Sequence, residues 1–267
     1  MKEKVVLITG CSRGLGKFLA EKLSGVGFIV YAGVKGEDDV KALQKDWKDS
    51  FSNVFPLNID ITNDDSCGRA VKKIISKEKR LDVLINNAGI TLVGLTQSFS
   101  VQDYLNILNI NAVGAFRLIK EVIPQMKRQK FGRIINITSL NGSISLPNFG
   151  LYSSSKFALE GLSLAWRHEL PEGIWITNIA PGAIAKGKND QEKKLPHVPA
   201  REKFWAIKTL MPMVSQEKIA KTIVKVVEDS NPPARILLGN DAHITTLLHR
   251  FLPAKIWEVL LDFVTKK

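Results

Sequence analysis

The sequence predicts an α/β fold: one doubly wound parallel sheet of seven strands with helices on both faces. Short apolar runs rich in β-branched residues alternate with longer segments in which apolar residues recur at helical spacing. This alternation is typical of strand–helix–strand units, whose parallel strands are buried on both faces and therefore contain few polar residues. Strands are expected at Val5–Thr9, Phe28–Val34, Val54–Asn58, Val83–Asn86, Arg133–Thr138, Trp175–Ala180 and Arg235–Leu238.

The segments between these strands carry the helical patterns. Helices are expected at Leu15–Leu23, Asp38–Trp47, Asp64–Ser76, Val101–Gln129, Tyr152–Glu169 and Gln216–Glu228. No repeat and no linker rich in Gly, Ser or Pro divides the chain, so we expect residues 1–267 to form a single domain. Charges and three prolines interrupt the pattern at residues 183–213, which we interpret as a substrate-loop insertion after the sixth strand.

Composition excludes several classes of protein. A hydrophobic content of 45% with 24% charged residues is that of a folded protein, and no apolar run approaches the ~20 residues of a membrane span. The apolar run near the N-terminus is shorter than the ~7–15 residues of a signal-peptide core. Two cysteines, Cys11 and Cys67, provide neither a disulfide framework nor metal-ligand spacing. We therefore expect a reduced, cytoplasmic protein that binds no metal.

The net charge of +12 does not by itself identify a partner. Lysine and arginine are spread over most of the chain, and no basic stripe alternates with aromatic residues. We therefore expect no nucleic-acid partner. A solvated basic surface and an attraction to anionic cofactors, substrates or lipid surfaces both remain open.

The turn after the first predicted strand is rich in glycine. Gly10, Gly14 and Gly16 are spaced G-x3-G-x-G, which differs from the commoner G-x-G-x-x-G pattern. Glycine allows a tight turn and a close approach of the backbone, and the N-terminus of the following helix offers N–H groups to a phosphate. The position of this turn predicts a dinucleotide site in a Rossmann-type domain.

The end of the second predicted strand indicates which dinucleotide binds. NAD-binding domains usually place an acid ~20 residues after the glycines, where it binds the ribose 2′-hydroxyl. Here Lys35 follows the strand, and no acid occurs before Glu37. Because Lys35, together with Arg13 in the glycine turn, would attract a 2′-phosphate, the sequence favours NADP(H) over NAD(H).

Tyr152 and Lys156 begin a predicted helix four residues apart, so they share one face of it. A free tyrosine has a pKa near ~10, too high for easy proton exchange at neutral pH. An ammonium ~4 Å away at an effective dielectric of ~20 would attract the phenolate by about 4 kcal/mol before desolvation costs. We therefore expect Lys156 to lower the pKa of Tyr152, which would act as general acid/base. Ser139, after the fifth strand, can donate to the substrate oxygen.

Several blocks of the sequence together resemble the short-chain dehydrogenase/reductase family. The resemblance runs from about Val5 to Gly182, and within it the segment YSSSKFALEGLSLAWRHEL is most similar to the hydroxysteroid and retinol dehydrogenases, which act on lipophilic alcohols and ketones. The blocks are TGCSRGLG (Thr9–Gly16), NNAG (Asn86–Gly89), Asn111 in ILNINAVG, Ser139 in INITS, Tyr152-x3-Lys156 and Pro181–Gly182.

The resemblance implies roles for individual residues. Asn111, Ser139, Tyr152 and Lys156 would be catalytic, with Asn111 holding a water that links Lys156 to solvent. Asp60 would meet the adenine, Asn87 the ribose, and the segment ending at Ile184 the nicotinamide. The implied cofactor contacts are Gly10, Ser12, Arg13, Gly14, Leu15, Gly16, Lys35, Asp60, Ile61, Asn87, Tyr152, Lys156 and Ile184. Lys186 stands where many relatives have threonine, which removes one expected hydroxyl contact.

These observations predict an NADP(H)-dependent oxidoreductase that interconverts a lipophilic ketone or aldehyde and its alcohol. The alternative is a non-catalytic NADP-binding sensor or scaffold on the same fold, which would be expected to lose the Tyr/Lys/Ser set. The resemblance also implies a homodimer or homotetramer formed through the long helices.

The C-terminal extension, residues 241–267, is predicted to be helical. Its apolar face is made of Ile256, Val259, Leu260, Phe263 and Val264. Packing on its own domain, packing on a second subunit, peripheral membrane contact and a lid over a lipophilic pocket all remain open for it.

Overall fold

The computed structural model of the chain describes residues 3–185 and 213–265. The predicted insertion at 183–213 therefore lies almost entirely outside the described residues, and Lys186 lies outside them as well. Because that segment is not described, the assignment of residues 1–267 to a single domain stays a prediction.

Within the described residues, seven strands form one sheet in the order β3-β2-β1-β4-β5-β6-β7, and every neighbouring pair is parallel. This confirms the predicted fold class. The order reverses at β1, because β2 and β3 lie on one side of it and β4 on the other. The loops that follow β1 and β4 therefore diverge and leave a crevice at the carboxyl edge. The strands are Val5–Thr9 (β1), Ile29–Val34 (β2), Val54–Asn58 (β3), Val83–Asn86 (β4), Gly132–Ile137 (β5), Ile174–Pro181 (β6) and Arg235–Leu238 (β7).

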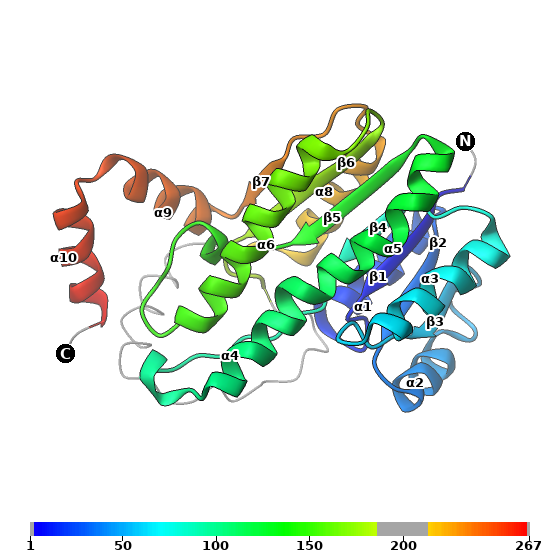
Figure 1. Ribbon diagram of the computed structural model, residues 1–267, viewed down its shortest axis with the longest axis horizontal. Coiled ribbons are helices and arrows are strands. Elements are labelled where there is room, and N and C mark those ends of the chain that lie inside the picture. The colour runs from blue at the N-terminus through cyan, green and yellow to red at the C-terminus, as the bar shows by residue number, and fades with distance from the viewer. Residues whose placement is uncertain (1–2, 186–212, 266–267) are drawn as a thin grey trace.

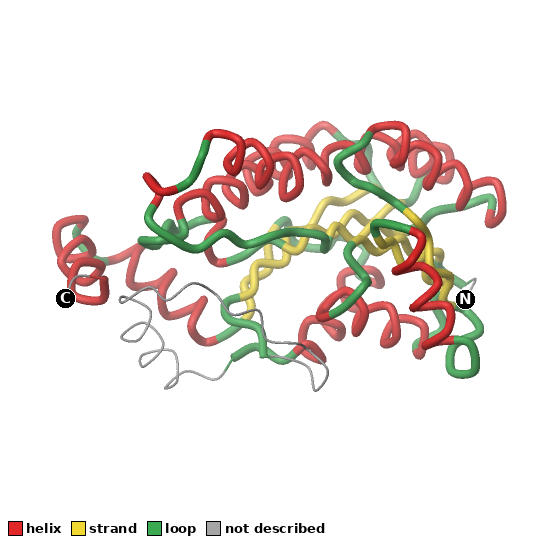
Figure 2. The backbone as a smooth tube through the Cα atoms, turned by 90° about the horizontal axis from the view of Figure 1, so that it is seen from below, coloured by secondary structure: helices red, strands yellow, loops and turns green. Residues whose placement is uncertain are grey.

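Helices cover both faces of the sheet, which lies as a layer between two helical layers in Figure 2. One face packs against α1 (Gly14–Gly25), α2 (Glu37–Trp47) and α8 (Gln216–Glu228). The other packs against α3 (Asp64–Glu78), α5 (Gly114–Gln129) and α6 (Gly150–Glu169).

Strand β1 shows how the sequence produces these two layers. Val6 and Ile8 belong to the core on the α1 side, whereas Val5 and Leu7 belong to the opposite core. Successive side chains of a strand point to opposite faces, and each face of this sheet is covered, so every position of β1 is buried.

The prediction of one continuous helix at Val101–Gln129 is wrong in the middle of that segment. The structure divides it into α4 (Val101–Leu108), a π-helical turn η2 (Asn109–Val113) and α5. The side chain of Asn111 pairs with the backbone of Ile90, accepting from its N–H at 2.8 Å and donating to its carbonyl at 2.9 Å. A π-turn widens the helix by one residue and so redirects this side chain.

Short elements complete the carboxyl edge of the sheet. The 3₁₀ turn η3 (Leu140–Gly142) follows β5 directly after Ser139, and a second turn, η1 (Thr96–Ser98), lies in the long loop after β4. Helix α6 begins at Gly150, two residues before the predicted start, so Tyr152 lies in its first turn.

The C-terminal extension consists of two helices, α9 (Asn240–Phe251) and α10 (Ala254–Thr265), which extend away from the sheet in Figure 1. Trp257 and Leu261 of α10 pack on a small apolar cluster that includes Leu140 and Ile144, so α10 contacts its own domain. Seven other apolar side chains of the two helices are exposed: Ile244, Leu247, Leu248, Phe251, Ile256, Val259 and Leu260. None of the helices in the described ranges is long and apolar enough to span a membrane.

Candidate active site

A cleft of about 440 Å³ opens at the crevice between the loops that follow β1, β2, β3 and β4. Most of the predicted cofactor contacts lie together in its lining: Gly10, Ser12, Arg13, Gly14, Leu15, Gly16, Lys35, Asp60, Ile61 and Asn87. Tyr152, Lys156 and Ile184 do not line this cleft. Other lining residues were not predicted as cofactor contacts, namely Thr9, Val34, Thr62, Gly89 and Ile90.

The glycine turn allows three pieces of backbone to approach one another closely. Gly10 has φ +72°, and a Cβ on it would lie 2.8 Å from the Cα of Ala88. A Cβ on Gly16 would overlap the carbonyl oxygen of Gly10 and lie 2.6 Å from Nδ2 of Asn87. The N-cap residue of α1, Arg13, makes no side-chain capping bond to the first N–H groups of the helix. Because Gly14, Leu15 and Gly16 line the cleft, these N–H groups are available there to an anion.

Thr9 and Asn87 join the loop after β1 to the loop after β4. The hydroxyl of Thr9, which is buried, accepts hydrogen bonds from the N–H groups of Asn87 at 3.1 Å and Ala88 at 3.0 Å. In return, the amide of Asn87 donates to the carbonyls of Thr9 at 2.9 Å and Gly10 at 3.3 Å. These four bonds hold the floor of the cleft in place.

Charged groups gather where β2 and β3 end. Nζ of Lys35 lies 2.9 Å from Oδ2 of Asp60, while Oδ1 of Asp60 accepts from the N–H and the hydroxyl of Thr62 at 2.9 and 2.6 Å. Burial alone would raise the pKa of Asp60, but the bonds from Thr62 and Lys35 lower it to about 2. Arg13 also lines this cleft, so two cations and one carboxylate face its interior.

Tyr152 and Lys156 lie close together, as the helical spacing predicts. The Lys156 side chain is buried, its ammonium donates to the carbonyl of Ile137 at 2.9 Å, and Nζ lies 5.7 Å from the centre of the Tyr152 ring. Burial lowers the pKa of Lys156 to about 8, and the charge of Glu160 acts in the opposite direction.

The expected lowering of the Tyr152 pKa by Lys156 is not what the structure shows. Burial raises the pKa of this phenol, and the hydroxyls of Ser139 and Thr91 act to lower it. The reason is that desolvation disfavours the phenolate, while the ammonium of Lys156 is bonded to a backbone carbonyl instead of the phenol.

Asn111 is hydrogen-bonded to α6, the helix that carries Tyr152 and Lys156. Its amide donates to the hydroxyl of Ser155 at 2.9 Å, in addition to its two bonds with Ile90. A Cβ on Gly89 would lie 3.2 Å from Oδ1 of Asn111 and 3.6 Å from Nζ of Lys156. The fold therefore brings Asn111, Ser139, Tyr152 and Lys156 together from three separate elements.

Ile184 and its neighbours follow β6, whereas the residues that line the cleft follow β1, β2, β3 and β4. Asp241 at the start of α9 accepts a hydrogen bond from the N–H of Ala183 at 2.7 Å, and its carboxylate occupies space that a Cβ on Gly182 would need. Ile184 pairs with Val214 in an isolated parallel bridge. Asp241 therefore anchors the segment predicted to meet the nicotinamide.

Sequence reasoning missed Thr91, Glu160, Arg235 and Asp241 as residues of this region. Only Glu160 carried a signal, because it lies four residues after Lys156 on the same helix face. The others come from a distant loop (Thr91), strand (Arg235) and helix (Asp241). No cluster of three or more His, Cys, Asp or Glu side chains that could hold a metal ion occurs among residues 3–185 and 213–265.

Comparisons with known proteins agree with this geometry. A family profile described as short chain dehydrogenase matches residues 4–195. The 3-ketodihydrosphingosine reductase of Bacteroides thetaiotaomicron is 33% identical over 250 residues, which cover 90% of this chain and 89% of that protein. The solved structure of a short-chain dehydrogenase from Streptomyces avermitilis matches with a TM-score of 0.81 at 26% identity, covering 97% of each chain.

A structure described as ElxO with NADP bound matches with a TM-score of 0.76 at 26% identity, covering 88% of this chain and 96% of that one. Together with the family profile and the bacterial relative, this confirms the resemblance seen in the sequence. The chain belongs to the short-chain dehydrogenase/reductase family and is an oxidoreductase.

Removing the hydroxyl of Thr9 tests the floor of the cleft. We expect Thr9→Val to lower the free energy of unfolding by about 1–3 kcal/mol, because two N–H groups lose their acceptor. Thr9→Ser keeps the hydroxyl and should cost about 1 kcal/mol or less, the value of one buried methyl group. Urea denaturation measures both changes, and equal losses in the two variants would contradict the role given to the hydroxyl.

Proposed function

We propose that this oxidoreductase reduces a lipophilic ketone or aldehyde to its alcohol with NADPH, and catalyses the reverse oxidation with NADP⁺. The observation that carries the proposal is the convergence of Ser139, Tyr152 and Lys156 next to a glycine-walled cleft at the carboxyl edge of the sheet. The non-catalytic alternative has no comparable support, because the acid/base pair is present and buried.

The residues of the cleft fit a dinucleotide with a 2′-phosphate. Gly10 and Gly16 allow backbone to come close where any Cβ would clash, which suits a pyrophosphate at the N-terminus of α1. Lys35, at the end of β2, and Arg13, in the glycine turn, supply positive charge to the cleft. Asp60 already pairs with Lys35, so it would orient that ammonium rather than select against NADP. The solved structure of ElxO, which contains NADP, is consistent with this choice.

The side chains account for the proton chemistry. The bound dinucleotide would supply the hydride that reduces the carbonyl carbon. Tyr152, whose raised pKa keeps it protonated at neutral pH, would give its proton to the carbonyl oxygen. Ser139 would donate a hydrogen bond to the same oxygen, and the Lys156 ammonium would stabilise the phenolate that remains. Asn111 would hold the water that returns a proton through Lys156.

We further propose that the substrate is a hydrophobic carbonyl compound, of the kind handled by hydroxysteroid and retinol dehydrogenases. The segment of α6 that resembles the hydroxysteroid and retinol dehydrogenases supports this class, and so does the similarity of the chain to a 3-ketodihydrosphingosine reductase. A long-chain β-keto compound, a steroid ketone and a retinoid aldehyde form the first panel to assay.

We also propose a cytoplasmic homodimer or homotetramer. Exposed apolar side chains on η2, α5 and α6 support association through the long helices, namely Val113, Phe116, Phe157 and Leu164. Two buried, unpaired cysteines, Cys11 and Cys67, are consistent with a reducing compartment.

The cofactor preference is tested at Lys35. We expect Lys35→Ala to weaken NADPH binding about tenfold, since one phosphate contact is lost, and to leave NADH binding unchanged. Lys41→Ala, which removes the same charge from the exposed face of α2, serves as the matched control. Titrations followed by nucleotide fluorescence measure the affinities of the wild-type protein and both variants for NADPH and NADH. Wild-type protein that prefers NADH would overturn the NADP assignment.

The acid/base role is tested at Tyr152. Replacement by Phe should lower kcat by about 10²–10⁴-fold, the usual contribution of a general acid, and should change NADPH affinity little. Tyr104→Phe, which alters an exposed phenol on α4, is the control and should keep wild-type kcat. Turnover that survives in the Tyr152→Phe enzyme would contradict the mechanism.

Sedimentation velocity tests the assembly. We expect the wild-type protein to sediment as a dimer or tetramer and Phe116→Glu to shift it toward monomer, because a buried carboxylate in the interface is costly. Val26→Glu replaces an apolar residue that is 56% exposed at the end of α1 and should leave the assembly unchanged. A monomeric wild-type protein would exclude association through these helices.

A further inference from the structure

A buried chain of polar side chains crosses the sheet behind the active site. The amide of Asn86 in β4 donates to Oδ1 of Asn136 in β5 at 2.8 Å, and Asn136 donates to Oδ1 of Asn178 in β6 at 3.1 Å. Asn178 then donates to Oε2 of Glu160 at 2.8 Å. All four residues are buried, and the chain ends on the carboxylate of Glu160.

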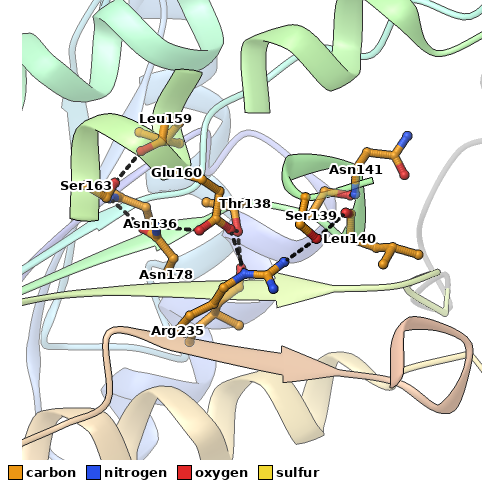
Figure 3. A network of polar contacts seen from close by, with 12 residues as sticks. Asn136, Thr138, Ser139, Leu140, Asn141, Leu159, Glu160, Ser163, Asn178 and Arg235 are labelled. Atoms are coloured by element: carbon orange, nitrogen blue, oxygen red, sulfur yellow. Dashed lines mark hydrogen bonds and ion pairs between the residues drawn. The ribbon is translucent and has the colours of Figure 1, made fainter. Parts of the chain in front are cut away.

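Figure 3 shows the carboxylate of Glu160 between the sheet and α6, close to Thr138, Asn178 and Arg235. Glu160 is only 6% exposed. Thr138, directly after β5, donates to Oε1 at 2.6 Å, and Nε of Arg235 in β7 lies 3.2 Å from the same oxygen. A buried carboxylate is tolerated when it is paired and hydrogen-bonded in this way.

The same contacts reach both ends of the loop that carries Ser139. Thr138 immediately precedes Ser139 in the chain. At the other end, Nη2 of Arg235 donates to the hydroxyl of Ser143 at 3.0 Å. Between them, a Cβ on Gly142 would lie 2.8 Å from Cγ of Glu160 and 3.3 Å from the carbonyl oxygen of Lys156. The loop is therefore pressed against the turn of α6 that contains Lys156 and Glu160.

Lys156 and Glu160 also interact through their charges. They lie one helical turn apart, and the buried ammonium of Lys156 has the Ile137 carbonyl as its hydrogen-bond partner. Burial lowers the pKa of Lys156, and the charge of Glu160 raises it. Among the described residues that face Glu160, Lys156 and Arg235 carry charge, whereas Thr138 and Asn178 are neutral donors.

We propose that Glu160, held in place by Arg235, Thr138 and Asn178, is a positioning residue for the reaction. Its carboxylate keeps the ammonium of Lys156 charged inside the protein and fixes the Ser139 loop against α6. The kinetic part of this inference rests on the proposed function, whereas the charge state of Lys156 can be measured without any substrate or cofactor.

The direct test is the titration of Lys156 followed by ¹³C NMR of the lysine ε-carbons, with the signal assigned by its loss in Lys156→Met. In wild-type protein we expect this lysine to titrate with a pKa of about 8. In Glu160→Gln the pKa of Lys156 should fall by about one unit, because the opposing anion is gone. An unchanged titration in Glu160→Gln would overturn the electrostatic role.

Asp82→Asn is the matched control. Asp82 is likewise a buried carboxylate paired with an arginine, Arg80, at 2.7 Å, but it lies before β4 at the opposite edge of the sheet. Because the charge of Asp82 raises the pKa of Lys4, this variant should shift the titration of Lys4 and leave that of Lys156 unchanged. An equal shift of Lys156 in both variants would overturn the specific role given to Glu160.

Kinetics test the positioning role. With NADPH and a ketone that the wild-type enzyme reduces, Glu160→Gln should move the alkaline limb of the kcat profile to lower pH by the same ~1 unit and leave KM for NADPH unchanged. Thr138→Val, which removes one donor and keeps every charge, should lower kcat about threefold or more, and Thr138→Ser should restore it.

These variants also separate the two proposals. If Glu160→Gln does not fold, the Thr138 pair decides, and wild-type kcat in Thr138→Val would overturn the positioning role. A wild-type protein that reduces no carbonyl compound would contradict the proposed function, and the NMR titration would still decide the effect of Glu160 on Lys156.

Discussion

Parallel pairing of all seven strands is the constraint on which this site depends. It brings the carboxyl ends of the strands to one edge, and the reversal of strand order at β1 separates the loops there into a cleft. Backbone groups that leave the sheet at this edge need partners, and Thr9, Asn87 and Asn111 supply them. The floor of the cleft and the position of Asn111 thus follow from the need to pair the backbone N–H and C=O groups beyond the ends of the parallel strands.

Burial has opposite effects on the charged groups at the two ends of the site. At the cleft, Asp60 gains enough hydrogen bonds to stay ionised despite partial burial. At the other end, Tyr152 and Lys156 are both shifted toward their neutral forms, because burial disfavours their charged forms more than their partners favour them. A buried anion one turn from Lys156, Glu160, opposes that shift. Its own burial on the inner face of the helix is tolerated because Thr138, Asn178 and Arg235 pair with it.

Much of the site could be predicted because many of its residues lie within short, contiguous segments of the sequence. The glycine turn, Lys35 and the Tyr152–Lys156 pair each depend on spacing within one strand–helix junction or one helix, and local geometry sets their relative positions. The π-turn at Asn111 could not be predicted, since it arises from a contact with Ile90 across the fold. Spacing alone carries no information about such a contact.

The amino-acid sequence by itself determined the fold class, the order of strands and helices, and most of the predicted cofactor contacts that line the cleft, because periodic burial and glycine spacing are local properties. The tertiary structure alone decided the protonation of the site and the partners of its charged groups. Those depend on burial and on residues from other strands, such as Arg235 in β7 beside Glu160 in α6. Desolvation is a property of the packed interior, and a linear pattern of residues does not contain it.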